Sequence, residues 1–546
     1  MKRALTVLLC AGALWVMQVP AIASDRTPVI VRLAPGASIA ELRARAGWFP
    51  IRERFHVVDA LSASLTSAQR ERLVGDPLVR GIEPERTYRI DGSTARASYG
   101  VAKAESDFRV TGDRDGAPKT FTTRDVVACV IDTGIDALHV DLNQGQVIGW
   151  KDFVNGRATP YDDNGHGTHV AGILAGQGDG AAAYRGVAPG VALVGVKAIS
   201  SSGTGSTSTI LSALQFCVDR KASYNIRIIN MSFGSPGPSD GADILSVAVN
   251  AAADHGILPV IAAGNDGPAR ASVGSPAAAA KALTVCSISD PGVKGFALSN
   301  WSSRGPTSDG RMKPDVCGPG QSITSARANS GNGYVTYSGT SMATPFVAGV
   351  AALMLDANNA LTPAQVKSMM MATAVDWTLP GVDAETGAGR LQTYEAVKRA
   401  GSFSGTGPAV PSHFAVSGSL RATNAVDRFT LRVTSLASPI AITLVIPGAS
   451  SARDFDMYLR EPSGSAIATS YSTTRQETIG VSPTVTGTYT LVVESYVGTG
   501  GYILDLSYSG GAPVMTADGK TPIAPKVRPS EPAALRSLRS TRALPG

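Results

Sequence analysis

The sequence predicts an α/β protein, in which a parallel central sheet with helices on both faces lies between a small α+β domain and an all-β sandwich. With 546 residues, the chain is too long for a single core, and its length allows roughly three or four domains. In the middle of the chain, β-rich runs such as residues 125–132 and 226–233 alternate with helical stretches such as residues 206–220. Strands that alternate with helices indicate a parallel sheet that is buried on both faces.

The flanking segments have different patterns. Strand-like and helical stretches alternate within residues 24–92, which predicts the small α+β domain, and the middle domain then spans residues 93–401. A segment rich in Gly, Ser and Pro predicts a linker at residues 402–410. Strands at short intervals without a helical period predict a β-sandwich over residues 411–510. Residues 511–546 are rich in Pro, Ala, Arg and Ser, and we predict a disordered tail.

Composition excludes several classes of protein. Charged residues make up 17% of the chain, with 59 Gly and 33 Pro, a balance that excludes coiled coils and solvated disordered chains. The net charge of +6 is spread over many ionisable residues. Without a concentrated basic patch it does not indicate a nucleic-acid partner.

The N-terminus resembles a secretory signal. Two basic residues precede an apolar run from Ala4 to Met17, and Ala21 and Ala23 supply the small residues that signal peptidase accepts. This run is shorter than the roughly 18 to 20 residues of a membrane-spanning helix, and no later segment is long enough either. We therefore predict a signal peptide at residues 1–23, a secreted, extracellular protein and no transmembrane segment.

Four cysteines remain after removal of the signal peptide, which contains Cys10. They are Cys129, Cys217, Cys286 and Cys317. In an oxidising compartment they can form disulfides. Three pairings are possible, and the sequence by itself does not choose among them.

Two candidate catalytic residues occur early in the middle domain. Asp132 ends an apolar strand, where the sites of parallel sheets assemble, although a lone Asp there is more often a turn or a helix cap. His166 lies between glycines at the open end of a predicted helix, and it is the candidate base. His169 lies one turn further on, in an apolar segment, and we expect a buried core residue. The two histidines lack the i, i+4 spacing and the intervening Glu of the zinc metalloproteases.

Ser341 is the candidate nucleophile. It begins a helix that is apolar nearly all round and is therefore buried. A Ser in this position is usually an N-cap, but a helix start also supplies N–H groups and a positive dipole end for an oxyanion. Hydrolases with a GxSxG segment require the order Ser, Asp, His, and only His413 follows Ser341. Asn265, in a Gly-rich turn, is either a turn residue or a hydrogen-bond donor to a substrate oxygen.

The four segments that carry these residues are VIDTGID, NGHGTHVAG, AAGNDG and GTSMATP. Together they resemble the subtilisin-like serine proteases, or subtilases. The resemblance implies a catalytic triad of Asp132, His166 and Ser341, with Asn265 as the oxyanion donor. It also implies peptide-bond hydrolysis through an acyl-enzyme, with no cofactor required for the chemistry.

Two further segments, INMSFG and SVGSP, resemble those that line the substrate cleft of the family. The resemblance implies that Ser232, Phe233 and Gly234 pair with an extended protein or peptide substrate, with Gly264 nearby. Gly274 corresponds to the floor of the pocket for the residue before the scissile bond. We predict a deep apolar pocket that prefers Phe, Tyr, Leu or Met.

The resemblance also suggests a metal site. Asp141, in the segment IDALHVDL, resembles a calcium ligand of the family, although the loop GQGDGAAAYRG does not clearly supply its partner residues. The resemblance implies calcium as a stabilising ion, with Asp141 as the candidate ligand. Phe346 stands where the family usually has His, a change that should affect packing more than chemistry.

The flanks resemble known companions of subtilases. Residues 24–92 resemble the inhibitory propeptide, which templates folding and inhibits the enzyme until it is cut, here between Arg89 and Tyr99. Residues 411–510 resemble the bacterial pre-peptidase C-terminal domain. Threading the cysteines onto the family fold implies the pairs 129 with 217 and 286 with 317, with free buried thiols as the alternative. The competing functional hypothesis is an inactive surface-attachment protein that binds through its β-sandwich.

Overall fold

The computed structural model describes residues 26–55, 60–84, 94–289, 296–379, 381–405, 412–447, 453–471 and 475–516. The chain forms two compact units, one within Met1–Arg89 and the other from Ile90–Pro522. The predicted signal peptide lies outside the described residues, as does most of the predicted tail.

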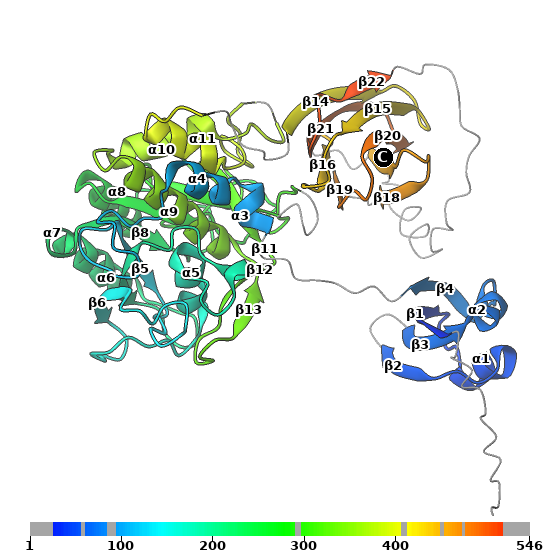
Figure 1. Ribbon diagram of the computed structural model, residues 1–546, viewed down its shortest axis with the longest axis horizontal. Helices are drawn as coiled ribbons and strands as arrows, with labels where there is room; N and C mark the ends of the chain where they lie inside the picture. Colours follow the sequence, from blue (N-terminus) through cyan, green and yellow to red (C-terminus); the bar gives the residue numbers. More distant parts are fainter. Residues whose placement is uncertain are drawn as a thin grey trace, which may run out of the picture. The chain divides into compact units, whose positions relative to one another are not determined.

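The N-terminal unit is a four-stranded antiparallel sheet with two helices (Figure 1). Its core contains the apolar residues of the sheet together with Leu42 and Leu73 from the helices. Thr66 caps the second helix, because its side chain accepts a hydrogen bond from the backbone of Gln69 and the Gln69 side chain bonds back. The elements are β1 (Arg26–Leu33), α1 (Ile39–Ala46), β2 (Ile51–Phe55), β3 (Ala60–Thr66), α2 (Ser67–Leu73) and β4 (Val79–Pro84).

The second unit contains a seven-stranded parallel sheet in the order β11-β10-β9-β8-β5-β7-β6. This sheet confirms the predicted α/β class. Its strands are β5 (Val127–Asp132), β6 (Val147–Asp152), β7 (Ala192–Lys197), β8 (Ile226–Met231), β9 (Leu258–Ala262), β10 (Leu283–Ser289) and β11 (Val316–Gln321). A two-stranded sheet of β12 (Ile323–Ala326) and β13 (Tyr334–Tyr337) follows.

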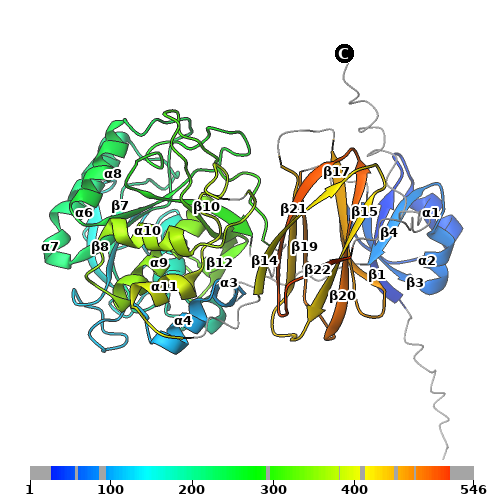
Figure 2. The ribbon, with the colours of Figure 1, turned by 90° about the horizontal axis from the view of Figure 1, so that it is seen from above.

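Helices cover both faces of the seven-stranded sheet, with α6 and α8 side by side on one face and α9 with α10 and α11 on the other (Figures 1 and 2). The helices are α3 (Thr94–Ser98), α4 (Val101–Phe108), α5 (His166–Ala175), α6 (Thr207–Asp219), α7 (Lys221–Tyr224), α8 (Ile244–Asp254), α9 (Thr340–Ala357), α10 (Pro363–Thr373) and α11 (Thr393–Ala400), with a 3₁₀ turn η1 (Ala182–Tyr184).

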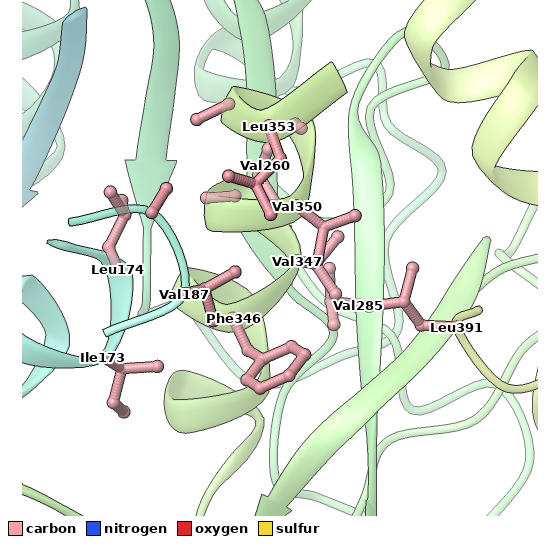
Figure 3. Packing of buried hydrophobic residues seen from close by; sticks show 14 of the residues in the cluster. Ile173, Leu174, Val187, Val260, Val285, Phe346, Val347, Val350, Leu353 and Leu391 are labelled. Carbon is pink, nitrogen blue, oxygen red and sulfur yellow. The ribbon is translucent and has the colours of Figure 1, made fainter. Parts of the chain in front are cut away.

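Alternate residues of the central strand β5 point to opposite faces of the sheet, as strand geometry requires. Cys129 and Ile131 belong to the core beneath α6 and α8, whereas Ala128 and Val130 belong to the core with α5 and α9. Figure 3 shows side chains of α9 packed against those of α5 and of strands β9 and β10. The expectation that no later segment is long enough to span a membrane was wrong by length and composition, because among the described helices α9 is long and apolar enough to cross one. Of this helix, 83% is buried within the protein, as expected for a core helix.

Both disulfide pairs implied by the family fold are confirmed. Cys129 and Cys217 join β5 to α6, and Cys286 and Cys317 join the adjacent strands β10 and β11 at paired register positions. The first bridge thus ties β5, the strand that ends in Asp132, to a helix that covers the sheet. The second ties two neighbouring strands of the sheet to each other.

The C-terminal region contains two antiparallel sheets, in the orders β14-β21-β16-β19 and β18-β17-β20-β15-β22. This agrees with the predicted sandwich. One boundary was wrong: Val514–Thr516, in the predicted tail, form β22 against β15, because three residues are too few to show strand alternation in the sequence. The strands are β14 (Ser412–Leu420), β15 (Val426–Val433), β16 (Ile440–Val445), β17 (Asp454–Arg460), β18 (Ala466–Ser470), β19 (Gln476–Val481), β20 (Gly487–Val497), β21 (Gly500–Tyr508) and β22 (Val514–Thr516).

Candidate active site

The candidate residues gather at the carboxyl edge of the parallel sheet. Asp132 is the last residue of β5, Ser232 directly follows β8, and Gly264 and Asn265 follow β9. Strands β6 and β7 lie on one side of β5 and the later strands from β8 onward on the other, so the strand order changes direction at β5. Such a switch point is where open parallel sheets form their sites.

Asp132 and His166 form a hydrogen-bonded pair. Asp132 Oδ1 lies 2.7 Å from His166 Nδ1 and also accepts a hydrogen bond from the backbone N–H of Thr133. The Asp132 residue is 1% exposed, whereas the side chain of His166 is 29% exposed. The pair therefore has a buried acid and an imidazole that is accessible from the sheet edge.

The pKa values of the two histidines of α5 shift in opposite directions. Burial lowers the pKa of His166, but the charge and hydrogen bond of Asp132, with a contribution from Asp162, outweigh burial and leave that pKa raised. Burial lowers the pKa of His169 to about 3. Nε2 of His169 lies 3.0 Å from the carbonyl of Val335, and the residue is fully buried, as expected for a core histidine.

Close backbone contact brings the pair together. A Cβ on Gly167 would lie 2.1 Å from the carbonyl oxygen of Gly134 and 3.1 Å from Cβ of Asp132. Only glycine allows the first turn of α5 to approach the end of β5 this closely. The glycine after His166 is therefore part of the geometry of the pair.

Ser341 lies in the first turn of α9, next to Thr340, the residue that binds Asn265. The Ser341 hydroxyl donates a hydrogen bond of 2.8 Å to the backbone carbonyl of Ser232. Oδ1 of Asn265 accepts from both the backbone N–H and the hydroxyl of Thr340, at 3.0 Å each. With its oxygen occupied, Asn265 has its amide NH₂ group left to donate to another acceptor.

The predicted substrate segments lie against one another. The backbone N–H of Ser235 donates to the carbonyl of Ser275 at 2.8 Å, and a Cβ on Gly274 would lie 1.9 Å from the Ser235 carbonyl oxygen. A pocket of about 550 Å³ adjoins them and contains none of the candidate catalytic residues. It is lined by Thr207, Ser235, Pro236, Pro238, Ser239, Asp240, Asp243, Ile244, Leu245, Ser275 and Ser308.

The surroundings of Asp141 do not fit a calcium site. Its Oδ1 accepts from the backbone N–H of Gly180 and its Oδ2 from the hydroxyl of Tyr334, both at 2.9 Å. A carboxylate whose two oxygens face hydrogen-bond donors is satisfied without a cation. These hydrogen bonds therefore give no support to the predicted calcium ligand, and we do not propose Asp141 as one.

Sequence reasoning missed a polar network behind the pair. Lys197 is completely buried, and its ammonium donates to the carbonyl of Thr133 and to Asp163, at 2.6 Å each. Asp162 accepts a hydrogen bond from the Thr133 hydroxyl at 3.0 Å. A lysine that ends the apolar run ALVGVK is the one signal in the sequence that pointed to this network.

Comparisons with known proteins decide the family. Residues 123–389 match the model of the subtilase family, and residues 425–495 match the bacterial pre-peptidase C-terminal domain. Serine protease AprX of Bacillus subtilis (strain 168) is 35% identical over 354 residues, which cover 60% of this chain and 76% of that protein. The chain belongs to the subtilase family.

Other relatives of this subtilase are similar in extent. Subtilisin E of Bacillus subtilis (strain 168) is 33% identical over 327 residues, covering 59% of this chain and 77% of its own length. Subtilisin of Bacillus pumilus is 38% identical over 257 residues, covering 46% of this chain and 85% of its own. The protein is accordingly a serine protease, a hydrolase of proteins that needs no cofactor for catalysis.

The departure at Phe346 is a packing feature, as expected. Its side chain is 3% exposed, and its ring meets the ring of Tyr99 edge-on with centroids 5.5 Å apart. This aromatic pair lies in the core on the α9 face of the sheet.

Proposed function

We propose that this subtilase is a secreted endopeptidase that hydrolyses peptide bonds through an acyl-enzyme on Ser341. Ser341 attacks the carbonyl carbon, His166 takes the serine proton and returns it to the leaving amine, and Asp132 stabilises the imidazolium. The observation that carries this proposal is the 2.7 Å contact between Asp132 Oδ1 and His166 Nδ1. It fixes the tautomer in which Nε2 is free to accept a proton.

Ser341 must turn before it can react. Its hydroxyl donates to the carbonyl of Ser232, and the proposed mechanism requires it to leave this bond and donate to His166 instead. An extended substrate that pairs with Ser232, Phe233 and Gly234 competes for the same carbonyl. Substrate binding therefore favours the reactive orientation of the hydroxyl.

Asn265 and the backbone N–H of Ser341 are proposed to hold the oxyanion. The bonds from Thr340 to Oδ1 of Asn265 orient the amide, and its NH₂ group then serves as donor beside the first turn of α9. The positive end of the helix dipole adds to the stabilisation of negative charge there.

The proposed substrate preference is for large apolar residues before the scissile bond. It rests on the resemblance of Gly274 to the pocket-floor glycine of the family. Gly274 is buried against the carbonyl of Ser235, and the absence of a side chain allows the two predicted cleft segments to approach each other this closely. Cleavage of a peptide library with strict preference for Gly or Ala at this position would contradict the pocket assignment.

Secretion and zymogen processing complete the proposal. Residues 24–92 act as the enzyme's own inhibitor and folding template, and the cut falls between Arg89 and Tyr99. Support for a cut before Thr94 comes from the packing of Ala95 and Tyr99, which belong to the core of the protease rather than to the N-terminal unit. Mass spectrometry of the secreted protein measures both this cut and the signal cleavage.

A labelled fluorophosphonate tests the catalytic proposal, because it reacts with activated serines and spares ordinary ones. We expect the wild-type protein to be labelled on one peptide that contains Ser341, and the Ser341→Ala variant to remain unlabelled. A folded, processed wild-type protein that is not labelled would instead support the competing hypothesis of an inactive attachment protein.

A further inference from the structure

A second buried carboxylate lies behind the Asp132–His166 pair. Asp162 is 1% exposed and accepts hydrogen bonds from five donors. Within the part of the chain that the structure describes, none of these donors is a lysine or an arginine. A buried carboxylate that lacks a cationic partner is costly, and such groups concentrate at functional sites.

The five donors come from the residue that follows Asp132 and from residues before and after His166. Oδ1 of Asp162 accepts from the Thr133 hydroxyl at 3.0 Å and from the backbone of Asn164 and Gly165 at 3.1 and 2.8 Å. Oδ2 accepts from the backbone and the hydroxyl of Thr168, at 2.9 and 2.7 Å. One carboxylate thus binds the residue after Asp132 and the residues on both sides of His166.

A hydroxyl closes this connection. Thr133 donates to Asp162 and accepts from the backbone N–H of Gly167 at 2.8 Å. The end of β5 and the first turn of α5 are therefore joined directly, through Thr133, and indirectly, through Asp162. The neighbouring cation does not neutralise this carboxylate through a hydrogen bond, since Lys197 bonds to Asp163.

We propose that Asp162 is a positioning residue for catalysis, which holds Asp132 and His166 in register and stabilises the imidazolium with a second negative charge. This inference rests on the proposed roles of the pair. Asp162 itself does not touch the reacting atoms.

The charges that face His166 agree with this role. Asp132 and Asp162 both raise the pKa of His166 against the effect of burial. His169, on the same helix, is neutral across the working pH range because its own pKa is lowered to about 3. A positive charge on His166 thus meets two carboxylates and no competing cation among these groups.

The test compares Asp162→Asn with a matched control, Asp152→Asn, in the full chain. The new NH₂ group of Asp162→Asn would face the two donors of Thr168, so the network opens and the second charge is lost. Asp152 is also buried, and it accepts from the backbone of Val154, Asn155 and Arg157. It does so without contacting the pair.

We expect Asp162→Asn to lower kcat/KM by about 10- to 100-fold, the scale of a small misplacement of reacting groups. We also expect it to move the acidic limb of the pH profile of kcat/KM to lower pH. Asp152→Asn should reduce thermal stability without moving that limb. The proposal would be overturned if Asp162→Asn lost stability but kept the wild-type position of the acidic limb in the pH profile of kcat/KM.

A second pair of variants covers the case in which Asp162→Asn does not fold. Thr133→Val removes the bridging hydroxyl at nearly constant shape, and Thr133→Ser restores it. The proposal requires that Thr133→Val lose kcat and shift the acidic limb of the pH profile, and that Thr133→Ser recover both. It fails if the two variants behave alike. Fluorophosphonate labelling of the wild-type protein separates this failure from failure of the proposed function. An unlabelled wild type refutes the proposed function and the inference that rests on it, whereas a labelled wild type with equal behaviour of the variants refutes the inference alone.

Discussion

Two helix starts carry the proposed reacting groups, and they are held in different ways. At α5, the carboxylate of Asp162 accepts from the backbone of Gly165 and Thr168, all within a few residues of His166. At α9, the amide of Asn265 accepts from Thr340, which lies 75 positions later in the chain. The first turn of α5, which carries His166, is thus held by a residue of the loop that precedes it. The first turn of α9, which carries Ser341, is held by a residue of the loop that follows β9.

The difference in charge matches the chemistry proposed for each turn. His166 becomes positive during the reaction, and the group that holds its turn is negative. The substrate oxygen becomes negative near Ser341, and the group that holds that turn is a neutral amide, which accepts from Thr340 through Oδ1 and keeps its NH₂ group as a donor. A carboxylate at α9 would repel the oxyanion, and an amide at α5 would weaken the imidazolium.

The largest effect expected from breaking this arrangement is at α9. Asn265→Ala removes a proposed oxyanion donor, and kcat should fall by about 10²- to 10³-fold, equivalent to about 3–4 kcal/mol, with little change in KM. Asn265→Asp removes the donor and adds a negative charge, so its kcat should fall at least as far. Steady-state kinetics on a peptide substrate measure both effects.

Thermal melting of the same Asn265 variants is the control, because the hydrogen bonds to Thr340 also support the fold. If Asn265→Ala retained more than a tenth of the wild-type kcat, the assignment of Asn265 as oxyanion donor would be wrong.

Much of the fold was predictable because the sheet is regular. The apolar run that ends in Asp132 has the composition of a buried parallel strand, and the alternation with helices predicted the layers on each side. The sequence could also place Asn265 after a strand, yet the direction of its amide depends on Thr340, a contact that only the folded chain creates.

The network at α5 shows where sequence reasoning stops. Asp162 and Asp163 are identical neighbours in a polar, turn-like run, and nothing in the sequence distinguishes them. In the structure Asp162 is buried at 1% exposure, whereas the side chain of Asp163 is 32% exposed and pairs with Lys197. Burial of one carboxylate and not the other is set by the approach of β5 to α5, which is a tertiary feature.

A medium effect is expected from glycines at the two helix starts. A Cβ on Gly167 would meet the Gly134 carbonyl at 2.1 Å, whereas a Cβ on Gly339 would have its nearest neighbour at 3.5 Å, an ordinary contact. The φ of Gly339 is 169°, an extended conformation open to any residue. Gly167→Ala should therefore cost about 1–3 kcal/mol of stability, and Gly339→Ala less than about 1 kcal/mol.

Chemical denaturation of these two variants, each in the Ser341→Ala background to prevent self-digestion, measures the difference. Equal stabilities would mean that the contact between α5 and β5 is looser than the structure has it.

The smallest expected effect is a pH dependence that belongs to α5 alone. Because the pKa of His166 is raised above its ordinary value of 6.5 by Asp132 and Asp162 despite burial, the protonated pair stabilises the folded state. That stabilisation is fully present below about pH 6.5, the unfolded value, and is lost as pH rises through the folded pKa. Activity runs the opposite way, because the base must be neutral, and should rise over the same interval.

Melting of Ser341→Ala across this interval, compared with Ser341→Ala carrying His166→Gln, isolates the contribution of the pair. The difference in stability should shrink as pH rises, whereas the difference caused by Asn265→Ala at α9, where the anchoring amide does not titrate, should stay constant. A constant difference for the histidine variant would show that Asp132 and Asp162 do not favour the imidazolium, and the contrast in charge between the two helix starts would then have no energetic basis.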